Sequence, residues 1–193
     1  MRVGVMTMVT DEGIRPPDLA RAVEERGFDS SFVPEHSHIP VGSDVPLREY
    51  RRLLDPFRTL TAAAAVASRL LLGTAVLLVS QRDPIQTAKE AATLDLLSDG
   101  RPVFGFGVGW LRESIGNHRT DPRVRGRVAE RADGGHPSVV ARRGSFVPRG
   151  VRGLRTGARV AEPVQRPHPP VYVGGANDTG TYAYATGDFG WYD

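Results

Sequence analysis

Apolar runs alternate with helix-forming stretches along the first 110 residues, and each predicted helix opens at a proline. The apolar runs predict strands at Val3–Met8, Phe28–Pro34, Leu70–Val79 and Val103–Val108. Helices are expected to begin at Pro16-Pro17, Asp55-Pro56 and Asp83-Pro84, because proline suits the first helical turn and aspartate caps it. Strands that alternate with helices pair in parallel through right-handed crossovers. The pattern therefore predicts an α/β fold, either a (β/α) barrel or an open doubly wound sheet.

Stop signals bound these elements. Gly27 is expected to close the first helix, and the alanine-rich second helix is expected to run to about Ser68. The third helix is predicted to reach about Leu97, before a Ser98-Asp99-Gly100 turn. Further along, Val171–Val173 is predicted as a strand that ends at Gly174-Gly175, followed by a short helix (179–185) and a last piece (187–192). This gives about six strands in one domain.

A segment near residues 132–161 breaks the pattern. Residues 119–159 contain 11 arginines against three acidic residues, interrupted by glycine and proline, with Phe146 as the one aromatic residue. A nucleic-acid-binding face would spread its cations over a folded surface with aromatics between them, so we expect no nucleic-acid partner. A segment with few apolar residues and high charge cannot offset the entropy of ordering. Residues 132–161 are therefore predicted to be loop or disorder, an insert without a packed helix.

Features of the whole chain exclude several classes of protein. The 193 residues include no cysteine, which excludes disulfides and thiolate metal sites. No apolar run approaches the ~20 residues of a membrane span, and Met1–Val5 opens into a strand instead of a signal peptide. We therefore expect a cytoplasmic protein that does not associate with membranes.

Several motifs together resemble the luciferase-like monooxygenase superfamily, and most closely its branch of F420-dependent oxidoreductases. The resemblance covers about residues 1–130 and 163–193. It is carried by these stretches in order: Gly27-Phe28-Asp29-Ser30, Val33-Pro34-Glu35-His36, Leu54-Asp55-Pro56-Phe57, Leu72-Gly73-Thr74-Ala75-Val76, Arg82-Asp83-Pro84, Ala88-Lys89-Glu90, Thr93-Leu94-Asp95, Gly105 to Trp110, and Pro163 to Gly175.

The resemblance implies a TIM-barrel flavoprotein whose strand ends hold FMN or coenzyme F420. The implied activity is hydride transfer or monooxygenation of a small-molecule substrate, in proteins that are often homodimers. A full barrel of this type has eight strands and ~250 residues, so we expect an incomplete barrel in a chain truncated at its C-terminus. Back-translating 136–162 with GC-rich codons and reading from the second base gives a helix end, an acidic turn and a strand pair. We interpret 132–161 as the product of a shifted reading frame.

The resemblance also implies roles at the strand ends, where active sites of this fold lie. His36 is expected beside the reactive edge of the cofactor ring, where a group that titrates near neutral pH can move a proton. Glu35 is expected to position the cofactor or to support the structure. At Thr74-Ala75-Val76, related deazaflavin enzymes have a bulge with a non-prolyl cis peptide behind the ring.

Glycines supply the remaining cofactor candidates. Gly107 and Gly109 are candidates because glycine lets the backbone approach a flat ring closely. The Gly174-Gly175 pair, between a strand and a helix, could offer N–H groups to a phosphate. Trp110 is expected either to line the substrate side or to pack in the core or at the rim.

Two alternative functions stay open from the sequence. The chain could be a non-catalytic remnant of such an oxidoreductase. It could also be a metal-dependent barrel hydrolase that uses His36 and His38, because two histidines at period-2 spacing share one strand face. The later strand ends offer mainly glycine and apolar residues, so no metal site is expected.

Overall fold

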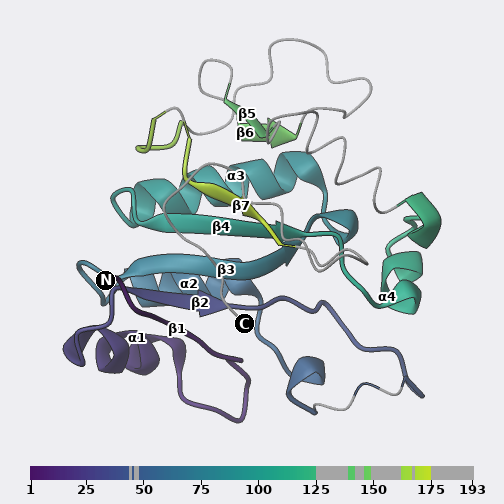
Figure 1. Cartoon of the computed structure of the whole chain (residues 1–193), viewed down its shortest axis with the longest axis horizontal. Coiled ribbons are helices and arrows are strands. Elements are labelled where there is room, and N and C mark those ends of the chain that lie inside the picture. Colours follow the sequence, from purple (N-terminus) through teal and green to yellow (C-terminus); the bar gives the residue numbers. More distant parts are fainter. Residues whose placement is uncertain are drawn as a thin grey trace.

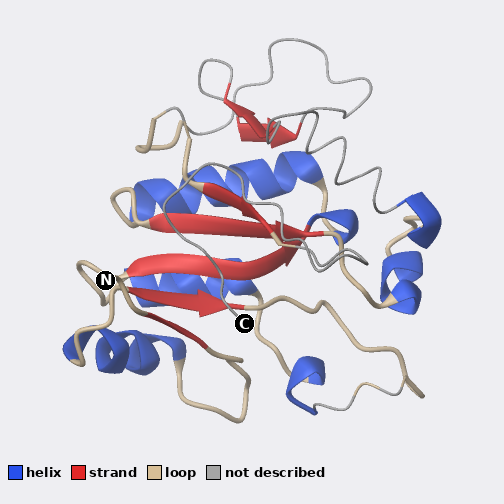
Figure 2. Cartoon of the chain, viewed as in Figure 1, coloured by secondary structure: helices blue, strands red, loops and turns tan. Residues whose placement is uncertain are grey.

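The computed structural model describes residues 1–43, 45, 48–124, 139–141, 146–148, 162–166 and 168–174. Figure 1 labels the elements in chain order, and Figure 2 distinguishes helices from strands. The elements are β1 (Gly4–Met6), α1 (Pro16–Glu25), β2 (Ser30–Val33), η1 (Arg48–Arg51), α2 (Pro56–Ala64), β3 (Leu71–Leu78), η2 (Val79–Gln81), α3 (Pro84–Leu97), β4 (Pro102–Gly107), α4 (Arg112–Asn117), η3 (Pro122–Val124), β5 (Val139–Ala141), β6 (Phe146–Pro148) and β7 (Val171–Val173).

Five strands form one parallel sheet in the order β1-β2-β3-β4-β7. The first four strands follow one another in chain order without a reversal. Right-handed crossovers that always step in the same direction put every connecting helix on one face of the sheet. Figure 1 shows α2 and α3 behind the sheet, as this argument requires. A doubly wound sheet reverses its strand order, so the sheet is of the (β/α)-barrel type, and in the part described it is not closed.

The predicted helix starts are confirmed. The Asp55 side chain accepts a hydrogen bond from the N–H of Arg58 at 3.0 Å, with Pro56 in the first turn of α2. Asp83 caps α3 in the same way through the N–H of Gln86 at 2.8 Å. Gly27 follows α1 with a φ of 82°, a conformation that glycine adopts without strain.

Several elements end earlier than the sequence predicted, and two of these ends have a clear cause. Helix α2 stops at Ala64 instead of Ser68, because Glu24 of α1 accepts hydrogen bonds from the successive N–H groups of Ser68, Arg69 and Leu70. The Glu24 carboxylate takes the place of the main-chain carbonyl groups that these N–H groups would bind if the helix continued. Strand β2 stops at Val33, since Pro34 has no N–H to continue the ladder.

A buried carboxylate seats the last strand of the sheet. Asp95 is 0% exposed and accepts both the backbone N–H of Gln165 (2.9 Å) and its side-chain Nε2–H (2.8 Å). The same amide also donates to the carbonyl of Pro102 at 3.0 Å. The proline-rich stretch that precedes β7 is thereby fixed to α3 and β4, which puts β7 beside β4.

Little of the predicted insert at 132–161 lies within the described residues. Strands β5 and β6 pair there as a small antiparallel ladder, where the sequence led us to expect loop. The helix predicted at 179–185 and the piece at 187–192 lie outside the described residues. The insert, its disorder and its origin in a shifted frame remain predictions.

The core lies between the sheet and its helices. Leu60 of α2 and Leu94 of α3 pack in one cluster with Leu72, Leu77 and Phe104 of the sheet, and each is at most 1% exposed. Full burial of a side chain of this size stabilises a fold by about 1.5–3 kcal/mol. None of the helices in the described part of the chain has the length and apolar character that a membrane crossing needs.

Candidate active site at the carboxyl edge of the sheet

The carboxyl ends of β2, β3, β4 and β7 meet at one edge of the sheet, because these strands are parallel neighbours. Glu35, just after β2, accepts a hydrogen bond from the N–H of Leu78 at the end of β3 (2.7 Å). Gly174, just after β7, donates its N–H to the carbonyl of Phe106 in β4 (2.7 Å). The Glu35-His36 pair, the third strand and Gly174 are therefore brought together, whereas Gly175 lies outside the described residues.

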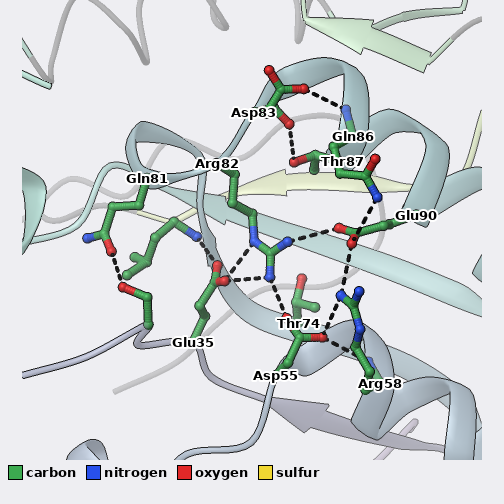
Figure 3. A network of polar contacts seen from close by, with 12 residues as sticks. Glu35, Asp55, Arg58, Thr74, Gln81, Arg82, Asp83, Gln86, Thr87 and Glu90 are labelled. Atoms are coloured by element: carbon green, nitrogen blue, oxygen red, sulfur yellow. Dashed lines mark hydrogen bonds and ion pairs between the residues drawn. The ribbon is translucent and has the colours of Figure 1, made fainter. Parts of the chain in front are cut away.

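Glu35 is held in a network of ion pairs centred on Arg82 (Figure 3). Its side chain is 8% exposed, and its second oxygen accepts from Arg82 Nε at 2.6 Å. Arg82 also pairs with Asp55 and Glu90, each at 3.0 Å, and its guanidinium lies 5.0 Å from the centre of the Phe57 ring. Both Glu35 oxygens thus have protein partners, an arrangement that suits the structural role.

The charged groups of this network stabilise one another in their charged forms. Burial opposes the charged form of Arg82, but the hydrogen bond to Glu35 and the charges of Glu35, Asp55 and Glu90 outweigh it. The pKa of Arg82 is consequently above its ordinary value. The network joins the loop after β2, the start of α2 and the middle of α3, so it fixes the position from which His36 projects.

His36 contacts two aromatic rings. Its ring centre is 4.9 Å from that of Tyr50 and 5.8 Å from that of Trp110, both edge-on. Nδ1 of His36 is buried and has no hydrogen-bond partner. Burial, and to a lesser extent the charge of His38, hold the pKa of His36 below its usual 6.5. The imidazole is therefore neutral near pH 7 and keeps an unused hydrogen-bonding atom.

Tyr50 reaches this position through the loop that follows β2. Arg52 binds Asp11 through two hydrogen bonds (2.7 and 2.6 Å), and Arg48 binds Glu12 at 2.8 Å. These pairs fasten the η1 region to the loop after β1. Tyr50 was not predicted as a site residue, although a polar loop after a strand end is where such a residue would be sought.

Strand β3 is irregular at the place where a bulge was expected. Its register against β4 shifts between Thr74 and Leu77, and the Ala75–Val76 peptide bond is cis. Thr74 is 0% exposed and bonds both backbone groups of Gly105, donating to the carbonyl (3.0 Å) and accepting from the N–H (3.1 Å). The expected bulge and cis bond are present, and the cofactor role of Thr74, Ala75 and Val76 stays a prediction.

The fold explains why glycine is present at positions 107, 109 and 174. A Cβ atom on Gly107 would lie 2.5 Å from Val76 Cγ2, and one on Gly174 would lie 2.8 Å from Val76 Cγ1. The Val76 side chain therefore fills the space beside both of these glycines. Gly109 has a φ of 78°, which strains other residues. Their cofactor-binding role stays a prediction.

A cluster of polar side chains, which the sequence did not reveal as a unit, lies beside His36. We call Ser37, His38, Gln81, Asn117 and His118 the histidine cluster. Ser37 Oγ lies 3.0 Å from His38 Nδ1, 3.1 Å from Gln81 Oε1 and 2.7 Å from His118 Nε2. These residues follow β2, β3 and β4, so a search of the loops after parallel strands would have found them.

The expectation that His36 and His38 share one strand face is wrong. Strand β2 ends at Val33, so His36 and His38 lie in a loop and do not share a strand face. His36 packs against Tyr50 and Trp110, whereas His38 contacts Asn117 at 2.8 Å. Among the described residues, no group of three or more His, Cys, Asp and Glu side chains could hold a metal ion.

A parallel sheet wound in one direction, with helices on one face and polar loops at its carboxyl edge, defines a protein of the (β/α)-barrel class. The sequence profile of the luciferase-like monooxygenase family matches residues 15–189. The chain belongs to this family.

Individual relatives agree with this assignment. Uncharacterized protein Rv0953c of Mycobacterium tuberculosis is 42% identical over 132 residues, which cover 63% of this chain and 47% of that protein. The crystal structure of monooxygenase RslO1 from Streptomyces bottropensis matches with a TM-score of 0.62 at 25% identity, over 90% of this chain and 53% of that one.

One further structure shows the fold alone. The coenzyme F420-dependent tetrahydromethanopterin reductase of Methanopyrus kandleri matches with a TM-score of 0.60 at 20% identity, over 93% of this chain and 51% of that one. This chain therefore spans about half the length of the proteins it resembles.

Proposed function

We propose that this chain supplies the cofactor-side half of an oxidoreductase site that binds coenzyme F420 or FMN at the carboxyl edge of the sheet. The proposal rests on one observation above all. Nδ1 of His36 is buried without a partner, in a ring that contacts Tyr50 and Trp110, at the edge where four parallel strands end. A buried polar atom without a partner costs free energy unless a ligand pairs with it.

The chemistry of this atom fits a heteroaromatic ring. An imidazole nitrogen can donate or accept a hydrogen bond according to its tautomer, and ring nitrogens and carbonyls of flavins and deazaflavins can do either. A bound ring of this kind would supply the redox chemistry, which no protein side chain here can provide. His36 would hold or release a proton at Nδ1, and its lowered pKa keeps it neutral and able to accept one at pH 7.

The surrounding residues would orient the ring. Val76 is half-buried at the bulge of β3, and Trp110, whose ring centre lies 5.8 Å from that of His36, is 53% exposed. An apolar side chain and an indole can contact the faces of a flat ligand and exclude water from it. Coenzyme F420 is the first choice, because the sequence motifs most closely resemble the branch of F420-dependent oxidoreductases.

Cofactor titration tests the proposal. The purified chain is titrated separately with coenzyme F420 and with FMN, and binding is followed by the change in cofactor fluorescence. We expect saturable binding of one of them, weakened about tenfold by His36→Ala, which is the effect of losing one hydrogen bond of ~1.4 kcal/mol. His168→Ala is the matched control, since His168 Nδ1 lies 2.7 Å from the Pro169 carbonyl, in the segment before β7.

The outcome separates an oxidoreductase site from the non-catalytic remnant. If neither cofactor binds the chain, the non-catalytic remnant is the better description. If a cofactor binds equally well to the His36→Ala variant, the assignment of His36 is wrong while the cofactor class stands.

A further inference from the structure

The histidine cluster is built around one hydroxyl group. Ser37 Oγ lies within hydrogen-bonding distance of His38 Nδ1, Gln81 Oε1 and His118 Nε2. At the far side of His38, its Nε2 lies 2.8 Å from the Asn117 amide nitrogen. The rings of His38 and His118 have centres 5.6 Å apart. Three loops, which follow β2, β3 and β4, therefore meet at a single side chain.

One arrangement of protons satisfies every contact. The Asn117 amide nitrogen can only donate, so His38 Nε2 accepts and its proton is on Nδ1. That proton is donated to Ser37 Oγ, whose own proton points to the Gln81 oxygen. Ser37 Oγ can then accept from His118 Nε2–H as well. The contacts assign His38 as the Nδ1–H tautomer and His118 as the Nε2–H tautomer.

The cluster connects the loop that carries His36 to the helix that follows Trp110. Ser37 is the residue after His36, and Asn117 and His118 lie at the end of α4, which begins two residues after Trp110. Gln81 also accepts from Ser114 of α4 at 3.3 Å. The hydroxyl of Ser37 thus joins the peptide beside His36 to the helix that follows Trp110.

We propose that Ser37 is a positioning residue, whose hydroxyl holds α4 against the loop after β2 and thereby sets the edge-on contact of His36 with Trp110. The importance of that contact rests on the proposed function, but the contact itself does not. Ser37 is exposed, so replacing it removes hydrogen bonds without opening a cavity in the core.

Histidine tautomers give a direct test in the chain without ligand. Side-chain nitrogen shifts of the five histidines are recorded by NMR in the ¹⁵N-labelled protein. We expect the Nδ1–H tautomer for His38 and the Nε2–H tautomer for His118, both changing toward mixtures in Ser37→Ala. Ser37→Thr keeps the hydroxyl and should restore the pattern. Ser43→Ala is the control, because Ser43 contributes its backbone carbonyl to Arg51 in the same loop.

A second variant tests the assignment from the other side. Asn117→Asp replaces the donor at His38 Nε2 by an acceptor, so we expect His38 to change to the Nε2–H tautomer. Unchanged tautomers in both Ser37→Ala and Asn117→Asp would overturn the proposal.

The contact between His36 and Trp110 needs a readout of its own. In a Trp191→Phe background Trp110 is the one remaining tryptophan. A protonated imidazole quenches a neighbouring indole, so the emission of Trp110 should fall as His36 takes up a proton. We expect this pH-dependent quenching to shrink at least twofold in Ser37→Ala and to return in Ser37→Thr. Full quenching in Ser37→Ala would show that Ser37 does not set the contact.

These measurements separate the two proposals. Failure of F420 and FMN to bind would remove the proposed function and leave the tautomer results unaffected. If instead a cofactor binds while Ser37→Ala shows unchanged tautomers and full quenching, the proposed function stands and the positioning role of Ser37 is wrong.

Discussion

The Glu35 carboxylate accepts a hydrogen bond from the backbone N–H of Leu78 at 2.7 Å and so ties the loop after β2 to the last residue of β3. Its other oxygen binds Arg82, whose guanidinium reaches two further carboxylates. Since His36 is the next residue along the chain, the position of the candidate catalytic imidazole depends on a buried ion-pair network.

Arg82→Met should destabilise the fold strongly. The substitution leaves Glu35 (8% exposed) without its cationic partner, and an uncompensated buried charge costs about 3–5 kcal/mol. Glu90 loses one of its two partners and keeps Arg58 at 2.9 Å. Arg82→Lys keeps the positive charge but lacks the planar set of N–H donors of the guanidinium, so its loss of stability should be smaller. Urea unfolding followed by circular dichroism measures both.

Arg21→Ala is the matched control for that series. Arg21 pairs with Asp18 on the surface of α1, where both side chains are more than half exposed, so the change should be below about 1 kcal/mol. An Arg82→Met variant as stable as Arg21→Ala would show that the network contributes nothing.

Gly107→Ala should be destabilising because of Val76. The added methyl group would lie 2.5 Å from Val76 Cγ2, and overpacking of this kind costs about 1–3 kcal/mol. The double variant Gly107→Ala/Val76→Ala should recover most of that loss, so it should be destabilised by less than the sum of the two single variants. Chemical unfolding of the four proteins in the cycle checks this.

A second glycine provides the comparison. Gly116 lies in α4 with no atom within 4 Å of an added Cβ, so Gly116→Ala should be neutral or stabilising by up to ~1 kcal/mol. If Gly107→Ala behaved like Gly116→Ala, close packing of Val76 would not be the reason for glycine at position 107.

Thr74→Val should cost more than Thr74→Ser. The valine has the shape of threonine but loses both hydrogen bonds to the buried backbone of Gly105, a penalty of about 1–3 kcal/mol. Serine keeps the hydroxyl and loses one methyl group. Thermal unfolding of the two variants measures the difference, and equal melting temperatures would contradict the role assigned to the hydroxyl.

Stability should decrease as the pH falls from 8 to 5. Burial, followed by the charge of His38, lowers the pKa of both His36 and His118 in the folded state, so the unfolded state binds more protons. The stability that depends on these neutral imidazoles is present above about pH 6.5 and is lost as the pH falls through their folded-state pKa values.

Replacing both histidines by glutamine should flatten this pH dependence. The range from pH 8 to 5 lies above the ordinary pKa of aspartate (3.8) and glutamate (4.5), so carboxylates contribute little to the slope. Urea midpoints at each pH give the comparison, with His168→Gln as the control. An unchanged slope in the double variant would contradict the assignment.

Much of the fold could be predicted because its signals are local. Asp55-Pro56 and Asp83-Pro84 each place a cap and a proline within one helical turn, and α2 and α3 begin where the sequence indicated. The apolar run at 70–79 likewise became β3 at Leu71–Leu78. Helix α4 was missed, because Arg112–Asn117 is short and lacks a capping side chain.

The sequence by itself determined the alternation of strands and helices and the edge at which the candidate residues gather, since a parallel sheet puts the ends of its strands together. Only the tertiary structure decided their partners. Arg82 binds Glu35 across 47 residues, Asn117 contacts His38 across 79 and Ser37 contacts His118 across 81. Local patterns do not encode such pairs, because each depends on how loops from different strands pack at the same edge.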